Sequence, residues 1–218
     1  MKNLEIYIHI PFCVRKCEYC DFLSFPADDD AKLRYVKGLM AEMIFYGPLM
    51  KNYQVSSVYI GGGTPSSIDE QWTAALMEGV FDCFNVLPDA EISIECNPGT
   101  LSREKLLAYR DAGINRLSIG LQSANNDELK LLGRIHTFEQ FVTNYEVARN
   151  VGFKNINVDL MYGLPGQSAS QYMATVNKII RLHPDHISAY SLIVEKGTPF
   201  YEKYKFDIVR QEAGMRTE

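Results

Sequence analysis

The sequence predicts an α/β fold in which six parallel strands alternate with helices. Two observations carry this prediction. Short runs rich in β-branched and aromatic residues alternate with longer runs of helical periodicity, and glycine, proline or asparagine separates most of them. The chain has 218 residues, enough to bury a sizeable core as one large domain or two small ones. Strands that are joined by helices form a parallel sheet with right-handed crossovers.

The predicted elements follow one another in a regular order. The first strand is the β-rich run 4–10, and the helix after it, over 31–47, has apolar residues at helical spacing and three possible capping aspartates at 28–30. Glycines mark the ends of later helices, and Pro184 follows the last one. The other strands are predicted at 56–60, 91–95, 115–119, 155–160 and 186–194, and the other helices at 69–84, 102–112, 126–132, 138–151 and 168–182.

This pattern leaves two architectures open, an open doubly wound sheet and a barrel. In both of them the carboxyl ends of the parallel strands gather at one edge, and ligands bind there. Candidate site residues are therefore those that follow the strands.

Composition limits the classes of function. The chain has 22 Lys and Arg residues against 27 Asp and Glu residues, a net charge of −5, and no basic run that would neutralise phosphates, so nucleic acid is not an expected partner. No apolar stretch approaches the roughly 18 residues of a membrane span, which still leaves peripheral contact with a membrane open. The first residues lack the apolar segment and cleavage site of a signal peptide, so we expect a cytoplasmic location.

Three of the five cysteines lie within eight residues, directly after the first strand. Cys13, Cys17 and Cys20 can bind three irons of a cubane and leave the fourth iron open for a chelating cofactor. The spacing also leaves open a zinc site and a redox pair, although no second pair of ligands appears at zinc-finger spacing. The isolated Cys83 and Cys96 are expected to pack as small apolar side chains.

Polar and flexible residues follow the next four strands. A glycine triplet with Thr64 ends the second strand, and free backbone N–H groups there could approach a ligand closely, although a plain turn would need the same residues. Glu95 ends the third strand, Gln122 follows the fourth, and Asp159 ends the fifth. Arg134 lies between the two helices after the fourth strand. Each alone is typical of a solvated loop or a salt bridge, but together they predict a ring around one pocket.

One segment resembles the radical S-adenosylmethionine superfamily: residues Tyr7 to Phe22, which read YIHIPFCVRKCEYCDF. More narrowly, it is similar to the branch that contains oxygen-independent coproporphyrinogen III oxidases and the related haem chaperones of the HemW type. The resemblance extends from Leu4 to about Phe200 and implies a partial (β/α)6 barrel. It also implies a [4Fe–4S] cluster on the three clustered cysteines, with S-adenosylmethionine chelating the fourth iron through its amino and carboxylate groups.

The resemblance assigns further residues to S-adenosylmethionine. The glycine turn would receive its amino group, and Arg134 would pair with its carboxylate, which a planar guanidinium binds through two hydrogen bonds. Acidic groups suit the ribose hydroxyls, the amino group or the sulfonium charge, and an amide suits either kind of partner. Tyr7 matches a cofactor-contacting tyrosine of the family. The implied cofactor-binding set is Tyr7, Gly62, Gly63, Thr64, Glu95, Gln122, Arg134 and Asp159.

Two functions are compatible with this resemblance. In a radical enzyme, the reduced cluster splits S-adenosylmethionine, and the resulting 5′-deoxyadenosyl radical abstracts hydrogen from a substrate such as a tetrapyrrole. A haem chaperone instead binds haem and delivers it to an acceptor protein. The related oxidases carry a further cysteine two residues after the third cluster ligand, where this chain has Phe22. We therefore expect a haem chaperone, with the radical enzyme as the alternative and coproporphyrinogen oxidation disfavoured.

The resemblance also predicts the domain organisation. Residues 1–200 would form the radical S-adenosylmethionine core and residues 201–218 a short tail, with the C-terminal domain of the family absent. The sixth strand should then be largely apolar and have an uncovered edge, which invites pairing with another chain. A homodimer is therefore an expected arrangement.

Overall fold

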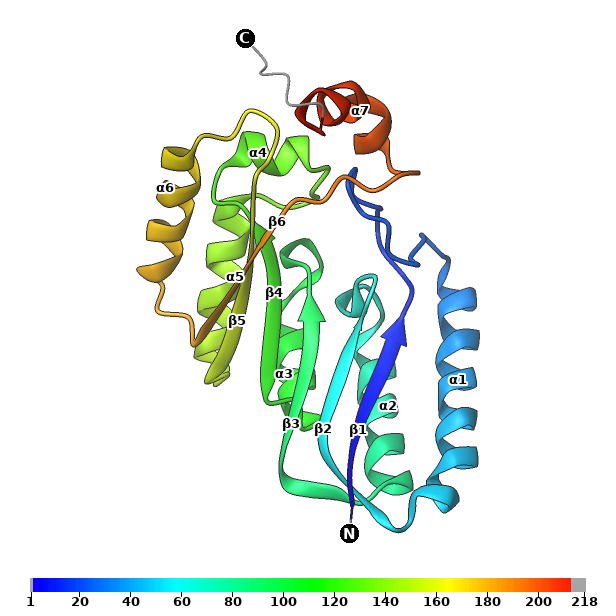
Figure 1. The fold of residues 1–218 in the computed structure, drawn as a ribbon. Coiled ribbons are helices and arrows are strands. Elements are labelled where there is room, and N and C mark those ends of the chain that lie inside the picture. Colours follow the sequence, from blue (N-terminus) through cyan, green and yellow to red (C-terminus); the bar gives the residue numbers. More distant parts are fainter. Residues whose placement is uncertain (1, 213–218) are drawn as a thin grey trace.

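The computed structural model describes residues 2–212, with side chains up to Lys205. Six parallel strands form one sheet in the order β1-β2-β3-β4-β5-β6, which curls into a half-barrel (Figure 1). The predicted partial barrel is thereby confirmed. The strands are β1 Lys2–Ile10, β2 Tyr53–Gly62, β3 Val86–Cys96, β4 Arg116–Gln122, β5 Asn155–Tyr162 and β6 His186–Ser191.

Helices cover the outer face of the half-barrel and one of its ends (Figure 1). Capping side chains explain where several of them begin: Asp28 accepts a hydrogen bond from Ala31 N at 2.8 Å, and Thr137 and Ser168 form capping boxes. The helices are α1 Asp29–Tyr46, α2 Glu70–Cys83, α3 Arg103–Asp111, α4 Asn126–Leu131, α5 Phe138–Asn150, α6 Ala169–Ile180 and α7 Pro199–Glu212.

The two faces of the sheet differ in chemistry. The outer face is apolar, and residues such as Ile60, Ile94 and Leu117 are at most 1% exposed beneath the helices. Successive side chains of a strand point to opposite faces. The residues beside these, such as Glu95 and Ser118, therefore point inward, and the inner face is a polar, concave surface.

The sixth strand differs from its prediction. β6 ends at Ser191, and the chain leaves the sheet after Leu192 donates one more backbone hydrogen bond to Tyr162. The predicted end at residue 194 was therefore wrong, and four of the six residues of β6 are exposed. They are exposed because, among residues 2–212, β6 pairs with β5 only, and no helix of this part of the chain covers the inner face of the sheet.

The segment predicted as a short tail contains a helix. α7 begins at Pro199, before the predicted boundary, and its first turn buries Phe200, which is 2% exposed against Leu132, Met161 and Leu164. Residues 213–218 lie outside the described part of the chain, and the division at residue 200 stays a prediction.

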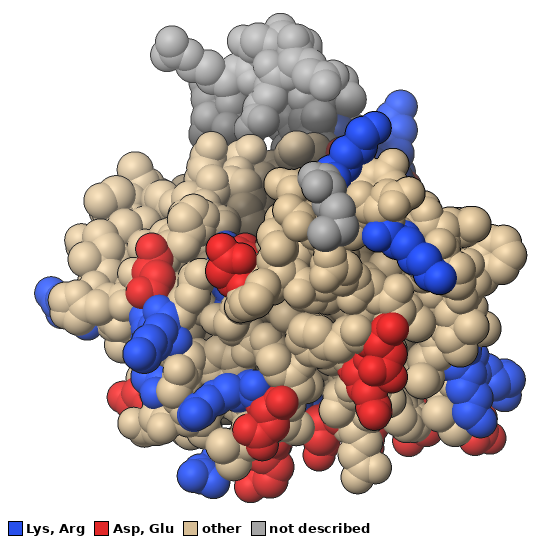
Figure 2. Space-filling model, turned by 90° about the horizontal axis from the view of Figure 1, so that it is seen from below, with Lys and Arg blue, Asp and Glu red and all other residues tan. Residues whose placement is uncertain are grey.

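No helix within residues 2–212 has both the length and the apolar character needed to cross a membrane. Figure 2 shows acidic and basic side chains interspersed on one face of the molecule, with neither sign predominating. This face therefore offers no extended basic surface for a polyanion.

Phe200→Ala is expected to lower the free energy of unfolding by about 3 kcal/mol, because truncating a buried phenylalanine removes contacts and leaves a cavity. Phe200 also ties α7 to the cysteine loop, since its amide donates to Glu18 O at 3.0 Å and its ring packs against Tyr19. Urea unfolding measures the change. Ile44→Ala, at a position 67% exposed on α1, is the control and should change stability by less than about 0.5 kcal/mol. If Phe200→Ala lowered the free energy of unfolding as little as Ile44→Ala, Phe200 would not be the anchor of α7.

Candidate functional site

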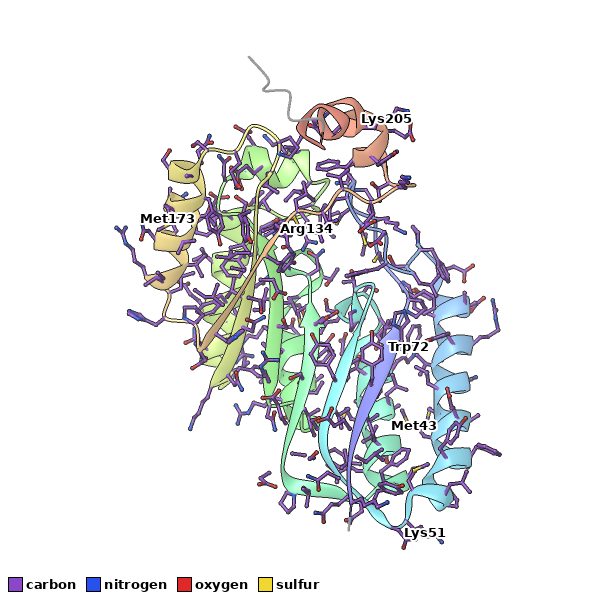
Figure 3. The ribbon with its side chains drawn as sticks, in the orientation of Figure 1. Met43, Lys51, Trp72, Arg134, Met173 and Lys205 are labelled. Carbon is purple, nitrogen blue, oxygen red and sulfur yellow. The ribbon has the colours of Figure 1, made fainter. Side chains whose placement is uncertain are left out.

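One pocket lies at the carboxyl ends of the strands, beneath the cysteine loop. Its lining includes the three clustered cysteines, the glycine turn and the predicted polar groups that the structure places on β3, β4 and β5. Every predicted site residue except Tyr7 lines this pocket. Figure 3 shows Arg134 at this end of the sheet. The ring that the sequence predicted is therefore present as one pocket.

Hydrogen bonds hold the cysteine loop over the strand ends. Cys13 N donates to Phe25 O at 3.1 Å, and Cys20 N donates to Cys17 O at 3.2 Å, which closes a tight turn between the last two cysteines. The Thr64 hydroxyl donates to Cys13 Sγ at 3.3 Å and so connects the loop with the end of β2. None of the three thiols is in a disulfide. The loop thus presents three free thiols to one side of the pocket.

The glycine turn after β2 lets the backbone approach this loop. Gly62 has φ +120°, a conformation that favours glycine. A side chain at Gly63 would meet Cys13 Sγ at 3.0 Å and Phe12 O at 2.9 Å, distances at which neighbouring atoms must shift. Gly63 is therefore required by close packing against the cysteine loop, and Gly62 by its backbone conformation, in addition to any ligand contact.

Two carboxylates face the pocket from the inner side of the sheet. Glu95 accepts hydrogen bonds from the Tyr59 hydroxyl at 2.8 Å and from Gly62 N at 3.1 Å. Asp159 accepts one from Asn157 Nδ2 at 2.8 Å. Glu95 is thus oriented by two groups of β2, and Asp159 by Asn157 of its own strand together with the Ser118 hydroxyl of β4.

The electrostatics of these acids favour a positively charged ligand. Burial raises the pKa of Glu95, and repulsion from Asp159 adds to the rise, although hydrogen bonds from Tyr59 and Gly62 oppose it. Burial likewise raises the pKa of Asp159 against the hydrogen bonds that it accepts. Among residues 2–205, neither acid forms an ion pair with a lysine or arginine. A cation bound between them would supply the missing partner.

Arg134 reaches across the pocket from the segment after α4. Its Nη2 donates to Gly120 O, and its Nη1 lies 3.5 Å from Cys17 Sγ. Its Nε is buried and has no partner within the described part of the chain. Because a buried N–H without an acceptor is costly, this atom marks a position where a ligand oxygen would be stabilising.

The residues present fit the cofactors that the resemblance implies. Free thiols suit an iron–sulfur cluster, the unpaired N–H of Arg134 suits a carboxylate, and the two buried acids suit a positive charge. In the described residues, no three His, Cys, Asp or Glu side chains are grouped as a single metal ion requires. A cubane makes no such demand, because each thiolate binds a different iron.

Tyr7 does not line the pocket. Its ring is 58% exposed on the inner face and stacks on Tyr59, with 6.2 Å between ring centroids. Its hydroxyl lies 2.9 Å from His9 Nδ1, on the face that the two residues share. Tyr7 is therefore connected to the pocket indirectly, because its ring contacts Tyr59, whose hydroxyl donates to Glu95. Its contact with a cofactor stays a prediction.

Several polar side chains of the pocket were not predicted. They include Tyr19, Asn97, Ser118 and Tyr190, and the Tyr190 hydroxyl donates to Gln122 Oε1 at 2.9 Å. The alternation along each strand is the signal that could have found two of them. Ser118 and Tyr190 occupy inward positions of β4 and β6.

His136 is a buried histidine that lies next to Asn97, a residue of the pocket lining. It is 4% exposed, and its ring lies 3.2 Å from Asn97 Oδ1 and 3.3 Å from Leu121 O. Burial, together with the nearby charge of Arg134, lowers the pKa of His136 to about 3. The imidazole is therefore neutral near pH 7 and connects the ends of β3 and β4 without adding charge.

Comparisons with known proteins agree with this geometry. Residues 7–179 match the family model described as the Radical SAM superfamily. The chain is 40% identical over 196 residues to the heme chaperone HemW of Bacillus subtilis, an alignment that covers 89% of this chain and 52% of that protein. It is 39% identical over 203 residues to HemW of Escherichia coli, covering 90% and 52%. The chain thus spans about half the length of the curated relatives it matches.

A solved structure shares the fold. Coproporphyrinogen III oxidase from Escherichia coli, described as a radical SAM enzyme, superposes with a TM-score of 0.82 at 28% sequence identity. The match covers 98% of this chain and 53% of the oxidase. The half-barrel is therefore an arrangement seen in that enzyme.

Asp159→Asn is expected to stabilise the cofactor-free chain increasingly as pH rises. The pKa of Asp159 is raised in the folded state, so its stabilising contribution is present at low pH and lost as pH rises above 3.8 through the folded pKa. Asparagine stays neutral at every pH, and the Ser118 hydroxyl, 3.3 Å from Asp159 Oδ2, can reverse its hydrogen bond. Urea unfolding of parent and variant between about pH 4 and pH 8 measures the difference.

Asp185→Asn is the matched control with the opposite sign. Although partial burial raises the pKa of Asp185, the amide of Ile156 and the ion pair with Arg149, at 2.8 Å, lower it overall. Its stabilisation is present above 3.8 and is lost as pH falls through the folded pKa. The control should therefore be less stable than the parent at the upper end of the range. If both variants changed the stability in the same direction at the upper end of the pH range, the directions assigned to the two pKa shifts would be wrong.

Proposed function

The chain belongs to the radical SAM superfamily, and from that premise we propose that it acts as a haem chaperone. In this proposal it carries a [4Fe–4S] cluster with S-adenosylmethionine, binds haem and transfers it to an acceptor protein. The main support is the 40% identity with a protein named heme chaperone HemW over 89% of this chain. The acceptor would recognise the haem-loaded protein, and its identity is left to experiment.

Different pocket residues are proposed to bind the cluster and S-adenosylmethionine. Cys13, Cys17 and Cys20 are the proposed cluster ligands, and their loop keeps them on one side of the pocket. Arg134 is the proposed partner of the S-adenosylmethionine carboxylate, because its Nε has no acceptor of its own in the described residues. Glu95 and Asp159 are proposed to face its positively charged groups. The remaining proposed contacts are Gly62, Gly63, Thr64 and Gln122, which line the same pocket.

When bound, the reduced cluster and S-adenosylmethionine together supply the potential for radical chemistry. A radical enzyme that acts on a tetrapyrrole is therefore the second candidate, and the superposition on coproporphyrinogen III oxidase favours it. Phe22 argues against that reaction, because the related oxidases resembled here have a cysteine at its position. Phe22 lines the pocket and is 64% exposed.

The free edge of β6 supports self-association as part of the proposal. Within the part of the chain that the structure describes, β6 pairs with β5 alone, and most of its residues are exposed. Unpaired N–H and C=O groups of such an edge are a template for a strand from a second copy. Sedimentation at several protein concentrations tests this, and a mass that stays that of one chain throughout would contradict it.

Anaerobic reconstitution of the parent chain should give about four irons per chain and the absorbance of a cubane cluster. Replacing any one of Cys13, Cys17 and Cys20 by alanine should abolish that signal, because the cluster loses a thiolate ligand. Cys83→Ala is the control, since Cys83 packs against the main core and not in the pocket. Loss of the cluster in the control but not in Cys17→Ala would show that the ligand assignment is wrong.

The haem-chaperone proposal predicts saturable binding of ferric haem by the cluster-loaded protein, followed on an optical titration. It also predicts no oxidation of coproporphyrinogen III under anaerobic, reducing conditions with S-adenosylmethionine present. Product analysis by chromatography provides the second measurement. Turnover of coproporphyrinogen III would favour the enzyme, whereas haem binding without turnover would support the chaperone.

A further inference from the structure

Gln122, one of the proposed contacts of S-adenosylmethionine, has an uncommon backbone conformation. Its φ is +74°, in the left-handed region that favours glycine. The strand is also irregular at this point, because the pairing of β4 with β5 shifts between Gly120 and Gln122. Such conformations are costly and persist where surrounding contacts hold the residue in place, and they cluster at ligand sites.

The hydroxyl of Tyr190 holds the side chain of Gln122. It donates to Gln122 Oε1 at 2.9 Å and does so across the sheet, because β5 lies between β4 and β6. Gln122 is 5% exposed, and among residues 2–205 no other group donates to its Oε1. One hydrogen bond from a distant strand thus determines how this nearly buried amide is turned.

Tyr190 is suited to act as the donor. Burial raises the pKa of Tyr190 to about 12, and repulsion from Asp159 adds to the rise, although the bond to Gln122 opposes it. The hydroxyl therefore keeps its proton near pH 7 and can donate throughout the range in which the protein is studied.

The orientation leaves the amide nitrogen of Gln122 for a ligand. Within the described residues, the two N–H groups of Nε2 have no acceptor, and the residue lines the pocket. A Cβ atom at Gly120 would lie 3.1 Å from Gln122 Nε2 and 3.3 Å from Arg134 Nη2, so both nitrogens lie beside the same backbone position. This part of the pocket therefore offers hydrogen-bond donors, whereas the two buried carboxylates offer acceptors.

We propose that Tyr190 is a positioning residue for S-adenosylmethionine, whose hydroxyl orients Gln122 so that the amide N–H groups donate to an oxygen of the bound cofactor. This inference rests on the proposed place of S-adenosylmethionine in this pocket. The carboxylate and the ribose hydroxyls of the cofactor both carry such oxygens. Tyr190 acts through Gln122 and needs no contact of its own with the cofactor.

A comparison with Glu95 shows why the hydroxyl of Tyr190 matters. Tyr59 donates to Glu95 at 2.8 Å in a similar way, but Gly62 N gives this carboxylate a second donor at 3.1 Å. Gln122 Oε1 has one donor in the described part of the chain. Without the Tyr190 hydroxyl, the amide can rotate about its soft terminal torsion and present either its oxygen or its nitrogen to the pocket.

The test measures the binding of S-adenosylmethionine to the cluster-reconstituted protein by anaerobic isothermal titration. Tyr190→Phe removes the hydroxyl and keeps the ring, and it should weaken binding by about 5-fold to 10-fold, the usual effect of losing one hydrogen bond. Tyr162→Phe is the matched control, because Tyr162 ends the neighbouring β5 with a similar exposure, 43% against 41%, and does not line the pocket. It should stay within about 2-fold of the parent.

A double-mutant cycle separates positioning from any direct or general structural role of Tyr190. In the Gln122→Ala background, Tyr190→Phe should change the dissociation constant by less than about 2-fold, because the side chain through which the hydroxyl acts is absent. If the losses from the two substitutions multiply, or if Tyr190→Phe alone binds as tightly as the parent, the assignment is overturned.

A third variant tests which end of the amide faces the ligand. Gln122→Glu keeps an acceptor for the Tyr190 hydroxyl but has no N–H group, so it should weaken binding at least as much as Gln122→Ala. Parent-like binding by Gln122→Glu would show that Gln122 does not donate to the cofactor. If the parent holds its cluster but binds no S-adenosylmethionine, the proposed cofactor site fails, and the role of Tyr190 falls with it. Failure of the cycle in a parent that binds the cofactor overturns the role of Tyr190 alone.

Discussion

The parallel alignment of six strands is the constraint on which the rest of the structure depends. Each helical crossover returns the chain to the same direction, so all six carboxyl ends meet at one end of the half-barrel. Residues as far apart in sequence as Cys13 and Tyr190 thereby line one pocket. Alternation along the strands then directs apolar side chains to the helices and polar ones to the concave face. The apolar core therefore lies on the outer face of the sheet, and the polar site lies on its inner face and at the strand ends.

The pocket contains groups that a fold without ligands would not favour. Burial raises the pKa values of Glu95 and Asp159, and Arg134 Nε lacks an acceptor within the described residues. Such local costs are typical of functional sites, where neighbouring structure holds groups in place until a ligand compensates them. A ligand that binds the folded state and supplies the missing partners also stabilises the fold. Structural stability and cofactor binding are therefore coupled through the same side chains.

The half-barrel has one covered end and an open inner face. The cysteine loop and the glycine turn cover the strand ends, whereas the inner face beneath them is open to solvent at Tyr7 and at β6. Asn157 joins the two regions because its amide contacts a pocket carboxylate on one side and His186 on the other.

The sequence by itself determined the order of the strands and helices, the glycine turn and the cysteine loop, because local periodicity, capping residues and ligand spacing are properties of short segments. It also predicted which polar groups follow the strands, since ligands gather at strand ends in any parallel sheet. Only the tertiary structure decided that Tyr7 stands outside the pocket and that Tyr190 lines it. These outcomes depend on how strongly the sheet curls and how the strands are staggered, which are set by long-range packing. The helix anchored by Phe200 was missed for the same reason, because its one buried ring finds its partners in segments far away in the sequence.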